Sequence, residues 1–178
     1  MKGIVCFLLL FSISSYAYTH KDIIRDYEAK KYKDVCLKSA YLYKKSERNE
    51  KILSIIGDAC AKSDYINPLG YIVRRLVSTP QYRQNGSYFA TLILQKKLIY
   101  QYMHDKIDLK NLRLPRTDHV LSIVFENLVQ KKFHIRDGKI IINNNGVEYR
   151  VWLGKEKLKV VYIFEYKDGK LVKRHGFL

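Results

Sequence analysis

Residues 145–170 read NGVEYRVWLGKEKLKVVYIFEYKDGK, and apolar side chains alternate along two runs of this stretch, 147–153 and 158–166. Successive side chains of a β-strand point to opposite faces, so alternation predicts two strands that each bury one face. We expect the buried faces to carry Val147, Tyr149, Val151 and Leu153 in the first run, and Leu158, Val160, Tyr162, Phe164 and Tyr166 in the second. The Asn-Gly and Asp-Gly pairs are typical of tight turns.

The same turn chemistry recurs through the C-terminal third. Turn signals at 136–139, 143–146, 154–157 and 167–170 divide it into about five strands, which predicts an antiparallel meander. A helix over 118–132, capped by Thr117 or Asp118, precedes the strands and is expected to pack on one face of the sheet. Pro115 marks the boundary before this helix.

Before Pro115, apolar residues recur with the spacing of an α-helix. We predict helices from Thr19, over 33–45, from Asn49, and from Asn67 to Thr79-Pro80. A polar loop at 81–87 then leads to a helix ending at His104, with Gln95, Lys96, Lys97 and Gln101 as its only solvent-facing side. The predicted fold is therefore α+β, with an antiparallel helical repeat-like bundle at 18–114 and a helix plus five-strand meander at 115–178.

The first 17 residues have the composition of a secretory signal. Lys2 precedes an apolar run, and Ser15-Tyr16-Ala17 fits a cleavage site, so the mature chain is expected to begin at Tyr18. The alternative is a buried N-terminal strand or helix. The signal predicts an exported, periplasmic protein.

The chain is strongly basic, with 33 Lys and Arg against 17 Asp and Glu. Export excludes nucleic acid as the natural partner of this charge. The remaining anionic partners are cell-wall polymers, lipid headgroups and acidic protein surfaces. The basic residues are scattered in pairs, so the alternative explanation is that they keep the protein soluble and form no binding site.

Two cysteines, Cys36 and Cys60, remain after the signal is removed. Each lies twelve residues from a helix–helix turn near Arg48 and faces the partner helix, so an antiparallel hairpin places them level with each other. An even number of cysteines in an exported chain favours a disulfide. Two buried free thiols or a redox pair are the alternatives.

The segment Gly57–Tyr65, GDACAKSDY, resembles a tetratricopeptide-type (TPR or Sel1) repeat motif, with a weaker copy at Tyr27–Tyr32. The resemblance covers about residues 21–78 and implies a concave groove that binds peptides or proteins. Leu69 departs from the small residue of the motif. The helix-then-meander at 118–178 resembles cystatin-like or NTF2-like modules in element order only.

Catalytic and metal-binding patterns are missing from the sequence. It contains no His-x-x-x-His, no Gly-x-Ser-x-Gly and no glycine-rich phosphate loop, so we expect no enzyme activity, metal, cofactor or small-molecule substrate. Glu126 is a candidate acid for cleaving a wall polymer, but the sequence offers no second carboxylate paired with it.

Tyrosines and basic residues gather in the helical half, a combination typical of protein interfaces. The predicted partner-binding residues are Tyr41, Tyr43, Lys44, Lys45, Tyr71, Arg74 and Arg75. The alternative is that these tyrosines border the core. The sequence therefore predicts a non-enzymatic scaffold or adaptor that binds another envelope protein, such as part of a flagellar motor. The alternative function is a binding module for cell-wall glycan or anionic lipid headgroups.

Overall fold

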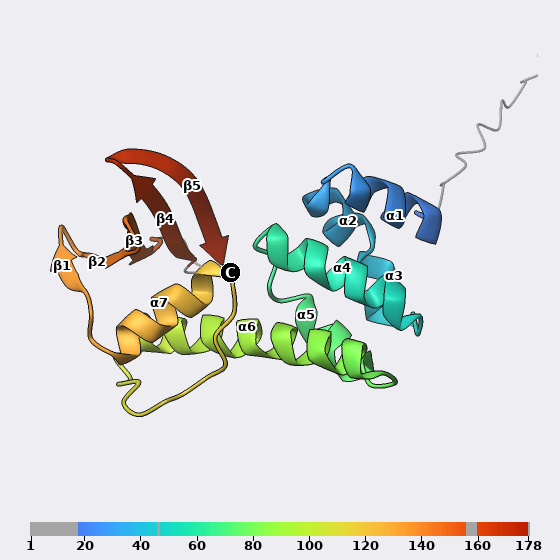
Figure 1. Ribbon diagram of the computed structural model, residues 1–178, viewed down its shortest axis with the longest axis horizontal. Coiled ribbons are helices and arrows are strands. Elements are labelled where there is room, and N and C mark those ends of the chain that lie inside the picture. The colour runs from blue at the N-terminus through green and yellow to red at the C-terminus, as the bar shows by residue number, and fades with distance from the viewer. Residues whose placement is uncertain (1–17, 46, 156–159, 178) are drawn as a thin grey trace, which may run out of the picture.

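The computed structural model describes residues 18–45, 47–155 and 160–177. The predicted signal peptide and part of the turn at 154–157 lie outside these residues. Helices form the N-terminal half and an antiparallel sheet forms the C-terminal end, so the protein has the predicted α+β class (Figure 1).

The helical half begins with α1 (His20–Glu28), α2 (Tyr32–Lys38), α3 (Ala40–Lys45) and α4 (Glu50–Lys62). Thr19 and Asp22 form a capping box at α1, and the Asn49 side chain caps α4, as the sequence predicts. The helix expected over 33–45 is interrupted at Ser39, a residue type that competes with helical hydrogen bonds. α5 (Leu69–Ile72) and a 3-10 turn (Val73–Arg75) follow.

The long helix α6 (Pro80–His104) begins earlier than predicted. We expected Thr79-Pro80 to end a helix, but the Thr79 hydroxyl accepts a hydrogen bond from the Tyr82 N–H and Pro80 occupies the first turn. Proline is tolerated there because the helix needs no N–H donor at that position. The expected polar loop at 81–87 is therefore helical.

The side of α6 that we predicted to face solvent is only partly exposed: Lys97 and Gln101 are exposed, whereas Gln95 and Lys96 are buried. Gln95 is 1% exposed and Lys96 is 9% exposed. The Gln95 amide donates to the Pro115 carbonyl (3.2 Å) and accepts from the Ser122 hydroxyl (3.0 Å). Gln95 is buried because these hydrogen bonds hold α6 against the next helix.

That next helix, α7 (Val120–Val129), is capped by the His119 imidazole and not by Thr117 or Asp118. Its apolar side lies against the sheet. The strands are β1 (His134–Arg136), β2 (Lys139–Asn144), β3 (Val147–Leu153), β4 (Val161–Lys167) and β5 (Lys170–Phe177). They pair in sequence order as an antiparallel meander, as predicted.

The two faces of the sheet differ in burial. The inner face, toward α7, carries the buried Tyr149, Val151, Val161, Ile163 and Phe177. The prediction for β4 is wrong: Val161 and Ile163 point inward, while Tyr162, Phe164 and Tyr166 lie on the opposite face and are only half-buried. Residues 160–164 are apolar on both faces, so alternation alone does not decide which side is buried.

Cys36 and Cys60 form a disulfide between α2 and α4, with their Cα atoms 4.9 Å apart. Both side chains are fully buried, and neighbouring Val35, Leu53 and Ile56 belong to the same core. The bond therefore crosses the centre of the helical half.

Among the described residues, no helix combines the length and apolar character needed to cross a bilayer.

Candidate functional site

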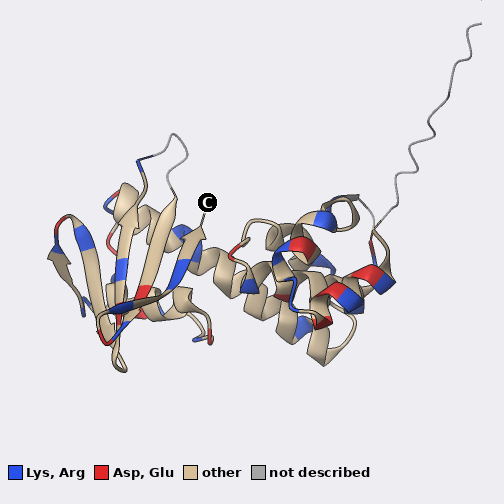
Figure 2. Ribbon diagram, turned by 90° about the horizontal axis from the view of Figure 1, so that it is seen from above, with Lys and Arg blue, Asp and Glu red and all other residues tan. Residues whose placement is uncertain are grey.

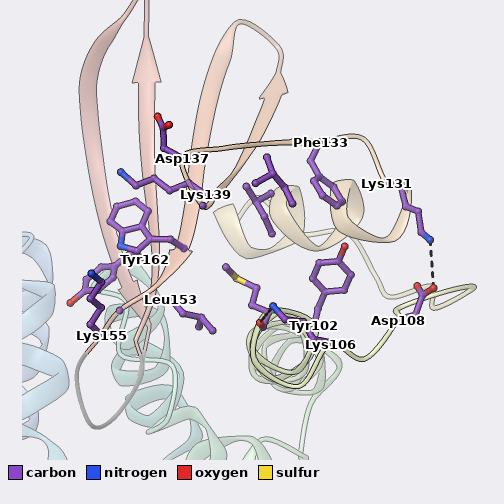
Figure 3. Close-up of a pocket in the computed structure, with 16 residues that line it drawn as sticks. Tyr102, Lys106, Asp108, Lys131, Phe133, Asp137, Lys139, Leu153, Lys155 and Tyr162 are labelled. Atoms are coloured by element: carbon purple, nitrogen blue, oxygen red, sulfur yellow. Dashed lines mark hydrogen bonds and ion pairs between the residues drawn. The ribbon is translucent and has the colours of Figure 1, made fainter.

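A hollow of about 1080 Å³ lies at one end of the sheet, between the strand ends and the C-terminal end of α6 (Figure 3). The β1–β2 turn contributes Asp137 and Gly138, and the end of β3 contributes Trp152 to Lys155. The site is therefore assembled from four separate segments of the chain: the end of α6, the α7–β1 connection, the first hairpin and the β3–β4 pair.

Two aromatic rings form one side of the hollow. Trp152 and Tyr162 are directly opposite each other on β3 and β4, and their rings stack with centroids 5.4 Å apart. The Lys139 ammonium lies 5.0 Å from the Trp152 ring. Antiparallel pairing thus holds a stacked aromatic pair beside a positive charge.

The opposite wall is apolar. It consists of Tyr102, Met103, Phe133, Ile135, Ile140 and Leu153. Tyr102 and Phe133 contact edge to face at 6.2 Å, so the end of α6 and the α7–β1 connection support each other. Ile135 is 70% exposed, which leaves an apolar side chain in contact with solvent at the wall.

Charged groups lie around these walls. They are Lys106, Lys131, Lys139, Lys155, Asp108 and Asp137. The Asp108 carboxylate pairs with Lys131 at 3.5 Å and Lys110 at 3.4 Å. Desolvation acts to raise the pKa of Asp108, but the hydrogen bond and charge of Lys110 and the charge of Lys131 outweigh it and lower that pKa. Asp108 is therefore ionised and held in place.

This arrangement is suited to binding a flat, hydroxylated ligand. Aromatic faces attract apolar C–H surfaces, and lysine and aspartate side chains donate and accept hydrogen bonds at the edges. Among the described residues, no cluster of His, Cys, Asp and Glu is suited to hold a metal ion.

A second polar cluster joins the sheet to the helical half. The His175 ring, 4% exposed, contacts Asp64 through Nδ1 and Glu165 through Nε2, both at 2.8 Å. Asp64 follows α4, whereas Glu165 lies on β4. Because carboxylates occupy both ring nitrogens, neither nitrogen is available to a substrate, and the cluster acts as a cross-link.

His119 supports the same junction. Its Nδ1 accepts from the Leu121 N–H and its Nε2 lies 3.3 Å from the Ala61 carbonyl, which fits a neutral ring protonated at Nε2. Burial lowers the pKa of His119. Neither this histidine nor His175 lines the hollow.

The predicted partner-binding residues lie in the helical half, away from the hollow. Tyr41, Lys44, Tyr71 and Arg74 are exposed, whereas Tyr43 is 3% exposed and packs beside the Tyr71 ring. The Arg75 guanidinium donates to the Tyr43 carbonyl at 2.7 Å. Lys45 is the last residue of α3. The structure brings Tyr43, Tyr71 and Arg75 together. Glu126 lies on α7, 3.6 Å from Arg116.

Sequence reasoning missed the residues of the hollow. Trp152 is not among the residues expected on the buried face of its strand, whereas Tyr162 is. The signal that identifies them is their cross-strand pairing, since a Trp and a Tyr directly opposite each other on one face of a sheet come into contact. The sequence shows both residues but not the register that joins them.

A comparison with known families identifies the C-terminal two thirds of the chain. The family model described as "Ricin-type beta-trefoil lectin C-terminal domain" matches residues 61–177. This match overturns the predicted resemblance to tetratricopeptide or Sel1 repeats. The quoted motif reflects the periodicity that all helix pairs share and does not identify a repeat family.

The matched residues run from the end of α4 to the end of β5, across the predicted domain boundary at residue 115, and they include every residue that lines the hollow. No curated protein and no solved structure matches the chain. Because the family model covers more than half of the sequence, the chain belongs to the family of ricin-type β-trefoil lectin C-terminal domains.

Proposed function

We propose that the protein is a non-enzymatic carbohydrate-binding module whose ligand occupies the hollow beside Trp152. The observation that carries the proposal is the stacked pair of Trp152 and Tyr162 at the hollow, with the Lys139 ammonium beside the indole. The lectin family supports it independently.

The binding mode follows from the two kinds of group in the site. A sugar ring presents an apolar face of C–H groups and an edge of hydroxyls. The exposed edge of the stacked Trp152–Tyr162 pair would contact the first, while Lys139 and Asp137 at the β1–β2 turn would contact the second. Ile135 on the other side would bury apolar area on binding.

The proposal includes binding without turnover. Asp108 and Asp137 are the carboxylates of the hollow, and Asp108 is already held by Lys110 and Lys131. A bound glycan is therefore expected to be recovered unchanged, as judged by chromatography after prolonged incubation.

We also propose that the protein works after export to the periplasm, where the predicted signal peptide would direct it. Cell-wall glycan is the polymer available there. An adaptor function in a flagellar motor is less well supported, because neither the family nor the site bears on it.

Trp152 is the only tryptophan of the chain, which provides a direct test. The protein without residues 1–17 is first screened on an immobilised glycan array, and glycans that bind are then titrated in solution while the indole fluorescence is followed. We expect a saturable change in fluorescence, because the ligand would cover the only indole.

The variant Trp152→Ala should lose at least about tenfold in affinity on the array, corresponding to about 1.4 kcal/mol. Tyr71→Ala is the matched control, since it removes an aromatic ring that is 44% exposed in the helical half. Absence of binding to every glycan, or equal binding by the wild-type protein and Trp152→Ala, would contradict the proposal.

A further inference from the structure

We propose that the ligand is an acidic polysaccharide, and that it extends from the hollow across the outer face of the sheet, which no described helix covers. This inference rests on the carbohydrate-binding function proposed above and adds the chemical class of the glycan and its path.

The outer face is the side of the sheet opposite α7. Its residues alternate with the buried inner ones, and α6 and α7 lie together on the other side (Figure 1). Aromatic and charged side chains make up most of this face: Arg136, Lys139, Glu148, Arg150, Trp152, Tyr162, Phe164, Tyr166 and Arg174.

Three aromatic rings of the outer face each have a cation beside them. The Lys139 ammonium lies 5.0 Å from the Trp152 ring, the Arg174 guanidinium 5.4 Å from Phe164, and the Arg150 guanidinium 3.8 Å from Tyr166. A guanidinium that lies near a ring keeps its N–H groups available for a carboxylate or sulfate. The face therefore repeats one unit, a ring next to a cation.

The charge of this face is unbalanced. On the strands, four cations, Arg136, Lys139, Arg150 and Arg174, stand against the carboxylate of Glu148, and the turns at the ends of the face add Asp137 and Asp168. Glu148 accepts from Arg150 at 2.6 Å and lies 3.3 Å from Arg136. The hydrogen bond from Arg150, with further contributions from Arg136, lowers the pKa of Glu148.

Lys139 and Arg174 are the cations that remain available to a ligand. Within the described residues, neither takes part in an ion pair. Figure 2 shows basic positions on several strands of the sheet. The excess positive charge complements a polymer with a carboxylate or sulfate on its sugars.

A second hollow of about 420 Å³ lies at the opposite end of the outer face. Its lining includes Arg136, Glu148, Arg150 and Tyr166. Along β4, Tyr162 belongs to the first hollow and Tyr166 to the second, and Phe164 lies between them. Alternate residues of a strand are about 7 Å apart, so the rings form a row that a chain of sugars can follow.

The test compares two polymers that differ only in charge. Polygalacturonate and its carboxyl-reduced, neutral form are titrated against the protein without residues 1–17, with Trp152 fluorescence as the readout. We expect polygalacturonate to bind at least about tenfold more tightly, the effect of one charge-assisted hydrogen bond. Salt should reduce this difference, because it screens exposed charges.

Arg174→Gln tests the path, since Arg174 lines neither hollow. It should weaken binding of the polymer about fivefold or more while leaving a short oligogalacturonate unaffected. Arg113→Gln is the matched control, because it removes the same charge from an exposed loop between α6 and α7. Circular dichroism checks that each variant is folded.

The outcomes separate this inference from the proposed function. Equal binding of the neutral polymer, with loss in Trp152→Ala, would leave a carbohydrate-binding module and overturn the acidic class. An unchanged polymer affinity in Arg174→Gln would overturn the extended path. Tighter binding to single-stranded DNA or to phosphatidylglycerol vesicles than to polygalacturonate would also overturn the inference. Failure to bind any glycan would overturn both.

Discussion

The helical half and the sheet use the same residue types in different ways. Both combine aromatic rings with Lys and Arg. In the helical half, tyrosine hydroxyls are engaged within the fold: Tyr18 donates to Asp26 at 2.8 Å, and Tyr27 donates to Asp58 and accepts from Lys62. On the sheet, Trp152, Phe164 and Tyr166 lie on a face that no described helix covers.

The difference shows that composition alone does not locate a binding surface. Helices packed around a disulfide-linked core surround most of their aromatic side chains with neighbours, although Tyr41 and Tyr71 remain 41% and 44% exposed. A single sheet with helices on one side leaves every second side chain of each strand outward. We therefore expect substitutions in the helical half to change stability, and substitutions on the outer face to change binding.

The largest expected effect on stability comes from the disulfide. Replacing both cysteines, Cys36→Ser with Cys60→Ser, should lower the free energy of unfolding by about 3 to 4 kcal/mol, because the bond closes a long loop in the unfolded chain. Urea unfolding followed by circular dichroism measures the change. Loss of glycan binding by a folded variant would contradict the assignment of stability to the helical half and of binding to the sheet.

Gly57→Ala should have the next largest effect. A methyl group at Gly57 would come within 2.6 Å of Cζ of the buried Phe89, so α4 and α6 would have to move apart. We expect a loss of about 2 kcal/mol. Gly70→Ala is the control, since the added carbon meets nothing within 4 Å. Equal midpoints of thermal unfolding for the two variants would contradict this packing.

Lys96 makes stability depend on pH. Burial, followed by the charge of Lys97, lowers the pKa of Lys96 to about 8 from its ordinary value of 10.5. Between these values the unfolded chain binds more protons than the folded one, so the Lys96 contribution to the free energy of unfolding increases with pH. Lys96→Met should remove this dependence and raise stability at neutral pH by about 1 kcal/mol.

The measurement for Lys96 is a series of urea titrations of both proteins from neutral pH to about pH 9, below the ordinary tyrosine pKa of about 10. The difference between the two unfolding free energies should shrink as the pH rises. A difference that stays constant would show that the ammonium group is not responsible.

An effect of similar size is expected when a single hydroxyl of the helical half is removed. Tyr27→Phe removes the group that links Asp58 and Lys62, and should cost about 1 kcal/mol in stability without changing glycan affinity. Thermal unfolding and fluorescence titration on the same preparation measure both quantities. Weakened glycan binding by Tyr27→Phe would show that the binding surface includes the helical half.

The sequence predicts local features of this fold better than features that depend on distant contacts. The capping box at Thr19, the cap at Asn49 and the turns at 136–139, 143–146 and 167–170 are local patterns, so they were predicted correctly. The pair Thr79-Pro80 is compatible with either end of a helix, so the sequence alone did not show that it begins α6. Gln95 was placed in solvent because its partners, Pro115 and Ser122, are distant in the sequence.

By itself the sequence predicted the α+β class, with helices before strands, and favoured a disulfide between Cys36 and Cys60. These depend on periodicity, turn residues and spacing, which are properties of neighbouring positions. Only the tertiary structure decided that Tyr162, Phe164 and Tyr166 face outward and that Trp152 lies opposite Tyr162. Alternation divides a strand into two faces, but the side that α7 covers is set by packing between segments far apart in the chain.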